Sequence, residues 1–493
     1  MKLPRTYSSS PRKSWKYPGL VGAVFFALAW EALARLVGNA ILLPGPLAVT
    51  RALGLLAVRA DFWLALAFSL ASVLAGFFTS IVLAVGSGLL NHFVPRTEAL
   101  FAPILSILKS APLAALTIIL MIWLEPKAMP FALIVLAVTP PVYSSTCAGL
   151  AGTSQKLLEM AFVFRFRRSD KIKAIYLPAL LKQLLPSLEY TSGLAWKAGV
   201  TGEILAQPFR RLGSGLYEAK ILLESAEVLA YLAVILLLSY GLGRILELAA
   251  HRLSAGASTS AQLVDTPLES PEALPDTPIP LASSPAASMT AISVRGLTKR
   301  FGDKVILKDF AADIPAAAVS VIAGPSGRGK STFFRLLMGL SRADQGTIDF
   351  RDEMFPDGNV RFACAFQESR LLEQYTVAEN LLMAAGLRKS DPQTKVFLAH
   401  WEPLIAEHGL PADQAVRYFS GGMKQKVSLL RALASPSDIL ILDEVFRELD
   451  PAAEAKLLQL FLREKGTRTV LLATHRGDLI EQTAGTVIYL SDS

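Results

Sequence analysis

The stretch Gly324-Pro-Ser-Gly-Arg-Gly-Lys-Ser-Thr332 decides the fold of the last third of this chain. An apolar run at 319–323, typical of a buried strand, precedes it, and a helix-periodic apolar pattern follows at 331–339. Glycines let backbone N–H groups approach phosphate oxygens, and the start of a helix adds partial positive charge. The pattern predicts a phosphate-binding loop in an α/β domain, with Lys330 on the β and γ phosphates and Ser331 on Mg²⁺.

A second apolar strand is expected at 439–442, and it ends in Asp443-Glu444. An Asp at the end of such a strand can hold Mg²⁺, directly or through water. Glu444 is then positioned to orient and deprotonate an attacking water. The alternative for Glu444 is an acid that caps the next helix.

Further short motifs follow in a fixed order. They are Phe366-Gln-Glu-Ser, Ser420-Gly-Gly-Met423, Leu449-Asp450 and Ala473-Thr-His475. With the phosphate loop and Asp443-Glu444, this order resembles the ATPases of ABC transporters over residues 291–490. Met423 stands where Gln is commoner, a substitution that also occurs in importers of the nitrate/sulfonate/taurine type.

The resemblance implies a site in which two copies of the chain enclose two ATP molecules, and therefore a homodimer through both domains. The catalytic residues it implies are Glu444, His475 on the γ-phosphate, and Gln367. The Mg²⁺ ligands are Ser331, Gln367 and Asp443. The nucleotide contacts are Phe301 on adenine, the phosphate loop Gly324, Pro325, Ser326, Gly327, Arg328, Gly329, Lys330, Ser331 and Thr332, the opposing Ser420, Gly421 and Gly422, and Asp450 at the dimer interface.

The composition indicates a membrane protein. Of 493 residues, 52% are hydrophobic and only 18% charged, and the mean hydropathy is +0.43, which is too apolar for an ordinary soluble enzyme. The net charge of +8 comes from basic residues beside apolar segments, as at a cytoplasmic membrane face, so nucleic acid is not expected as a partner. Cys147 and Cys364 have no partner spacing, which argues against a disulfide or metal framework.

Six helical spans are predicted in an all-α polytopic domain at 19–253. A basic tail at 1–18 precedes them, and an uncleaved first span is favoured over a signal peptide because the apolar run is long and holds Glu31 and Arg35. With this tail inside, the basic loop after the fourth span and the α/β domain also lie inside, while Arg210 and Arg211 fall outside as a counter-signal. The expected spans lie near 19–37, 62–90, 111–124, 128–150, 179–206 and 226–250.

The loop at 154–178 contains Glu159-Met-Ala161 and, further on, Leu177-Pro178. It resembles the cytoplasmic coupling loop of ABC importer permeases, which has Glu-Ala-Ala, a Gly and a Leu-Pro at fixed spacing. Arg165 stands at the Gly position, so the turn could be shaped differently. The alternative is an ordinary amphipathic loop with basic residues at lipid headgroups.

Two more stretches, at 42–49 and 192–203, resemble permeases of the nitrate/sulfonate/taurine type. The second stretch carries Lys197 and Glu203, which could contact a substrate or pair between helices. Its glycines, Gly193, Gly199 and Gly202, are expected to allow close helix packing.

A Pro-, Ser- and Thr-rich segment at 254–290 predicts a disordered linker to the ATP-binding domain at 291–493. Together the resemblances imply an importer of the bacterial inner membrane, in contact with lipid, which moves a small anion delivered by an extracytoplasmic binding protein. An ABC exporter and a non-transporting ABC regulator are the alternatives. The membrane half looks short for an exporter, and the intact Lys330, Glu444 and His475 favour hydrolysis without proving transport.

Overall fold

The computed structural model describes residues 18–259, 289–325, 327–351, 355, 359–447, 449–474, 483 and 486–490. Most of the basic tail and of the linker, together with Ser326 and His475, lie outside these residues. The chain divides into two compact units, Met1–Ala151 with Lys182–Ala250, and Gly152–Leu181 with His251–Ser493. The coupling loop therefore belongs to the same unit as the α/β fold.

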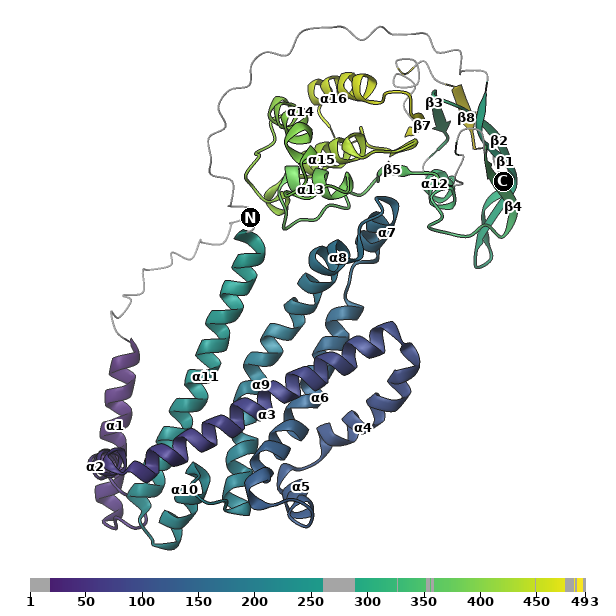
Figure 1. The fold of residues 1–493 in the computed structure, drawn as a ribbon. Helices are drawn as coiled ribbons and strands as arrows, with labels where there is room; N and C mark the ends of the chain where they lie inside the picture. Colours follow the sequence, from purple (N-terminus) through teal and green to yellow (C-terminus); the bar gives the residue numbers. More distant parts are fainter. Residues whose placement is uncertain are drawn as a thin grey trace, which may run out of the picture. The chain divides into compact units, whose positions relative to one another are not determined.

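The first unit is helical (Figure 1). Its helices are α1 (Pro18–Val37), α2 (Pro46–Val58), α3 (Ala60–Phe93), α4 (Glu98–Ser110), α5 (Leu113–Leu120), α6 (Met129–Ala151), α9 (Leu177–Ala206), α10 (Leu212–Ile221) and α11 (Ser225–Thr259), with short 3₁₀ turns at Pro95–Thr97 and Pro126–Ala128. Because α11 runs to Thr259, six residues expected in the linker are helical; the first proline after them is Pro267.

Six continuous spans are not evident. Among the described residues, three helices are long and apolar enough to cross a membrane, namely Ala60–Phe93, Pro126–Ala151 and Ser225–Ala250. The expected span at 111–124 contains only the eight-residue α5, which forms with the preceding helix, Pro95–Ser110, a pair bent by 106°. Pro112, which has no amide hydrogen and separates α4 from α5, accounts for this break. The 30-residue α9 carries Glu189, Lys197 and Glu203, which lower its hydropathy.

Small residues let the helices of this unit approach closely. A Cβ on Gly199 would lie 3.1 Å from Ile134, and one on Gly202 would lie 3.0 Å from Leu133, so both glycines of α9 pack on α6 as expected. Gly193 differs, because a Cβ there would meet nothing within 4 Å.

The buried Glu203 carboxylate contacts protein groups on or next to α10 rather than solvent. Its side chain is 1% exposed, and its Oε2 accepts a hydrogen bond of 2.9 Å from the amide of Gly213 on α10. The guanidinium of Arg211 lies 3.9 Å from the other oxygen, and that of Arg210 lies 3.3 Å from Asp61. Both arginines that opposed the expected topology are thus ion-paired. Lys197, in contrast, is exposed on this unit.

Replacing Glu203 by Ala should destabilise the helical unit by about 1–3 kcal/mol, because the buried amide of Gly213 loses its acceptor. Thermal unfolding in detergent measures this change. Glu218→Ala on the exposed face of α10 is the matched control. Equal unfolding temperatures for the two variants would show that the Glu203 contact contributes nothing.

The second unit contains two sheets (Figure 1). A five-stranded sheet has the order β5-β6-β7-β3-β8, in which each neighbouring pair is parallel, and an antiparallel sheet has the order β2-β1-β4. β3, β6 and β7 are buried along their whole length, which explains their mainly apolar sequences. The strands are β1 (Thr290–Phe301), β2 (Lys304–Pro315), β3 (Val319–Ala323), β4 (Gln345–Phe350), β5 (Phe362–Ala365), β6 (Ile439–Asp443), β7 (Thr469–Thr474) and β8 (Thr486–Tyr489).

The helices that accompany these sheets lie between the strands along the chain. They are α12 (Lys330–Leu337), α13 (Val377–Ala384), α14 (Gln393–Glu407), α15 (Gly421–Ala434) and α16 (Pro451–Glu464), with a 3₁₀ turn at Val416–Tyr418. The coupling loop forms α7 (Gln155–Val163), α8 (Arg168–Lys171) and a π-helical turn, Ile172–Tyr176. Met160, Phe164 and Ile175 of this loop belong to the same buried cluster as β5, β6 and α15. Apolar burial therefore holds the loop on the α/β fold.

Candidate functional site

The phosphate loop, Gln367 and Asp443-Glu444 lie at one edge of the parallel sheet. β3 leads into the phosphate loop, β5 into the segment with Gln367, and β6 ends at Asp443. Parallel strands place their carboxyl ends together, and this edge is where α/β sheets bind ligands. β7 also ends here at Thr474, but the following His475 lies outside the described residues.

The Lys330 side chain folds back onto the phosphate loop. The ammonium donates hydrogen bonds of 2.7 and 3.1 Å to the carbonyl oxygens of Gly324 and Pro325, and the side chain is 4% exposed. Gly329 immediately precedes α12 with a φ of +91°, and a Cβ there would lie 2.9 Å from Ile306 of β2. Only glycine fits that position.

Ser331 and Asp443 come together across the sheet edge. Burial raises the pKa of Asp443 to about 6, opposed by a hydrogen bond from Ser331. The Oδ1 of Asp443 is buried, and within the described part of the chain no group bonds to it. The Ser331 hydroxyl and the unbonded Oδ1 of Asp443 together fit Mg²⁺, because this ion prefers oxygen ligands.

Glu444 lies next to Asp443 and is held from several directions. Its Oε1 is 3.5 Å from the ammonium of Lys330, and its Oε2 accepts hydrogen bonds from Gln367 at 3.3 Å and Arg447 at 3.2 Å. Its φ of +50° is unusual for a residue other than glycine. Backbone strain of this kind concentrates at functional sites.

Most of the remaining predicted residues occupy exposed positions. Ser420 caps α15 by accepting a hydrogen bond from the amide of Met423, with Gly421 and Gly422 in the first turn. Asp450 caps α16 through the amide of Ala453 at 2.9 Å. Phe301 ends β1 with 55% of its surface exposed, as a ring that stacks on a base requires. Thr332 is half-buried on α12, Gly327 and Arg328 are exposed in the loop, and Ser326 lies outside the described residues.

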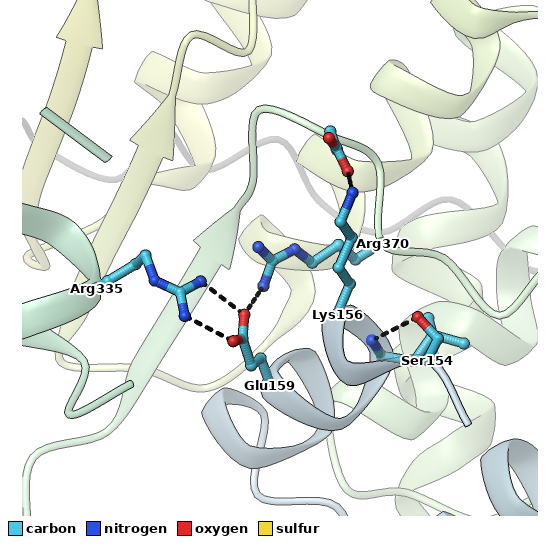
Figure 2. Close-up of polar contacts among 7 residues, drawn as sticks. Ser154, Lys156, Glu159, Arg335 and Arg370 are labelled. Atoms are coloured by element: carbon cyan, nitrogen blue, oxygen red, sulfur yellow. Dashed lines mark hydrogen bonds and ion pairs between the residues drawn. The ribbon is translucent and has the colours of Figure 1, made fainter. Parts of the chain in front are cut away.

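Glu159 of the coupling loop joins α7 to the segments around this site (Figure 2). Arg335 of α12 donates to both carboxylate oxygens at 2.7 and 2.8 Å, and Arg370 donates to Oε2 at 2.7 Å. The hydrogen bond from Arg335, together with the charges of both guanidiniums, lowers the pKa of Glu159. Its carboxylate is therefore attached both to the helix after the phosphate loop and to the segment after Gln367.

Sequence reasoning missed Arg335 and Arg370. Arg335 is the second basic residue of α12, after Lys330, and Arg370 is three residues beyond Gln367. The sequence signal for each was only that a basic residue lies close to a nucleotide-binding motif. Their common partner, however, is separated from them by 176 and 211 residues, which no local pattern reveals.

Two family models match this chain in succession. Residues 76–255 match the model described as "Binding-protein-dependent transport system inner membrane component". Residues 307–447 match the model described as "ABC transporter". The chain thus carries both a permease and an ATPase.

Curated relatives resemble the ATPase part. The Aliphatic sulfonates import ATP-binding protein SsuB of Corynebacterium glutamicum is 37% identical over 206 residues, which are 41% of this chain and 81% of the relative. A protein of the same name from Rhodopseudomonas palustris is 38% identical, over 41% of this chain and 70% of its own. The Nod factor export ATP-binding protein I of Bradyrhizobium diazoefficiens is 35% identical, over 38% of this chain and 63% of its own.

The ATPase part by itself therefore resembles both import and export proteins, and the permease model distinguishes between them. Binding-protein-dependent permeases are importer components, which agrees with the coupling-loop motif around Glu159. The chain belongs to the ABC transporter family, as an importer-type permease fused to the ATPase whose ATP hydrolysis is coupled to transport.

Proposed function

We propose that this chain is one half of a homodimeric importer in the bacterial inner membrane. It moves a small organic or inorganic anion, such as a sulfonate, taurine or nitrate, delivered by an extracytoplasmic binding protein. The names of the two SsuB relatives support the sulfonate class. The observation that carries the proposal is the attachment of the Glu159 carboxylate to Arg335 and Arg370, because it links the permease loop to the ATP-binding segments.

Six crossings agree with this function. Besides the three apolar helices, we assign crossings to α1, to the bent pair α4–α5 and to α9. A bent or polar helix can cross where neighbouring helices or a water-filled path satisfy its polar groups. An even number of crossings keeps the coupling loop and the ATPase on the side of the basic N-terminal tail.

For the nucleotide, each predicted residue has a chemical task. Lys330 and the phosphate-loop amides bind the β and γ phosphates, and Phe301 stacks on adenine. Ser331, Asp443 and Gln367 would hold Mg²⁺, which when bound would neutralise charge developing on the phosphates. Glu444 accepts the proton of the attacking water, and His475 contacts the γ-phosphate.

The second copy completes the site. The α15 N-terminus, with Ser420, Gly421 and Gly422, carries amides that have no backbone partner within the helix and a partial positive charge, so it suits the γ-phosphate of ATP bound to the partner. Asp450 lies in the loop that meets the partner. ATP binding thus brings the two ATPase parts together, and the Glu159 contact passes the movement to the permease.

Uptake into proteoliposomes tests the proposal. The protein is reconstituted with ATP and Mg²⁺ enclosed, and the cognate binding protein with a labelled alkanesulfonate is placed outside. We expect accumulation that requires both ATP and the binding protein. Enclosed AMP-PNP, which resists hydrolysis, is the control and should leave only background label.

Two results would contradict the proposal. ATP-dependent efflux without any binding protein would establish an exporter. ATP hydrolysis without movement of sulfonate, taurine or nitrate in either direction, in the presence of the binding protein, would contradict the assigned substrate class.

A further inference from the structure

The turn after α7 has the geometry of a helix end that normally uses glycine. The amide of Phe166 bonds to the carbonyl of Ala161 at 2.9 Å, and the amide of Arg165 bonds to that of Phe162 at 3.1 Å. This is a Schellman motif, whose residue beyond the helix cap takes the left-handed conformation. Arg165 occupies that position with a φ of +53°. The turn therefore keeps a glycine-like shape although its side chain disfavours it.

The Arg165 side chain makes a contact that offsets this strain. Its Nη2 donates a hydrogen bond of 2.7 Å to the carbonyl of Val360, just before β5. Its charge also contributes, after the larger effect of Arg361, to the lowered pKa of Asp438, which immediately precedes β6. A charged donor on a carbonyl is stronger than a neutral one. Arg165 thus binds just before the strand that leads to Gln367, and its charge acts at the start of the strand that ends in Asp443.

Contacts of α7 and of the turn after it lie on both sides of β5. Lys156 and Glu159 pair with Glu368 and Arg370 after the strand, whereas Arg165 binds Val360 before it. The lengths agree, since nine helical residues span about 14 Å and four strand residues about 13 Å. Apolar burial and the Glu159 ion pairs hold the middle of α7 on the α/β fold. The Arg165 bond adds a polar attachment beyond its C-terminal end, which restricts the direction of the helix.

We propose that Arg165 is a second anchor of the coupling loop, which fixes the direction of α7 along β5 so that engagement of the ATPase does not depend on Glu159 alone. Beside it, the ring of Phe164 packs under the guanidinium of Arg431 on α15 at 4.7 Å. The turn therefore contacts α15, whose N-terminus we assign to the γ-phosphate, in addition to the segment before β5. Arg165 is a positioning residue, and the effect on transport rests on the proposed importer function.

Hydrogen exchange of the full-length protein in lipid nanodiscs tests the anchor without any transport assay. Arg165→Gly removes both the strain and the Val360 bond, and Arg165→Ala removes the bond alone. We expect the amides of 164–167 to exchange about tenfold faster in the Gly variant and faster still in the Ala variant. Arg165→Lys, which can still donate to a carbonyl, should fall between wild type and Ala.

The control is Arg167→Ala, which loses the same charge two residues away at an exposed position and should exchange like wild type. Peptides from β3 and β6 report whether each variant is folded. Exchange in Arg165→Gly that equals or falls below that of wild type would overturn the anchor, because the arginine would then only be tolerated in the turn.

Coupling provides the second readout. In Glu159→Gln, we expect part of the ATPase stimulation by substrate-loaded binding protein to survive. In the double variant with Arg165→Gly, we expect this stimulation to be about tenfold smaller than in Glu159→Gln. No further loss in the double variant would refute independent anchoring. If wild type itself shows no stimulation, the importer proposal fails, and the exchange result still decides the anchor.

Discussion

Replacing Glu444 by Gln should reduce ATP hydrolysis by two to four orders of magnitude, about 3–5 kcal/mol in barrier height. The amide keeps the shape of the carboxylate and can still accept from Gln367 and Arg447, but it cannot take a proton from water. ATP binding should survive, because Lys330 and the loop amides are unchanged. Phosphate release at saturating ATP measures the loss.

The same Glu444 variant should accumulate as an ATP-bound dimer of its ATPase parts, because the step that separates them is blocked. Retention of labelled ATP after gel filtration measures this species. Glu402→Gln, on the exposed surface of α14, is the matched control and should hydrolyse ATP like wild type. Substantial residual turnover in Glu444→Gln would remove Glu444 from the catalytic role.

Replacing Glu159 by Gln should separate hydrolysis from transport. The loss of charge-assisted bonds to Arg335 and Arg370 weakens the attachment of α7 by about 2 kcal/mol. We expect basal ATPase activity within about twofold of wild type, because Glu159 contacts no predicted nucleotide ligand, and sulfonate uptake at least about tenfold lower. Parallel measurement of phosphate release and uptake in proteoliposomes gives the ratio.

Lys156→Gln is the control on the same helix. Its ion pair with Glu368 joins side chains that are 59% and 65% exposed, and such pairs contribute little. Its uptake should therefore stay near that of wild type. Equal uptake in Lys156→Gln and Glu159→Gln would place the coupling elsewhere.

The pH dependence of the Glu159 contact has a definite sign. Its pKa is lowered in the folded protein, so the contact contributes its full stability above the unfolded value of 4.5. That stability is lost as pH falls through the lowered pKa. The contact is therefore complete near neutral pH, where both variants are compared.

Much of the ATPase part was predictable because its motifs are local. The apolar run before Gly324 and the run before Asp443 are buried strands, β3 and β6, at the expected places. Parallel pairing then brings their ends to one edge without further information. The helical part was less predictable, because the broken helix pair at Pro112 and the polar α9 depend on neighbours that hydropathy does not describe.

The sequence alone determined that the chain binds ATP and that its N-terminal part is helical and apolar, since glycine spacing, strand ends and hydropathy act over short distances. Only the tertiary structure decided what holds the coupling loop. The partners of Glu159 and Arg165 are 176, 211 and 195 residues away. Arg165 looked like a departure that could reshape the turn, yet the turn keeps its left-handed residue. A bond to Val360 offsets the strain, and such a bond exists only once the chain has folded.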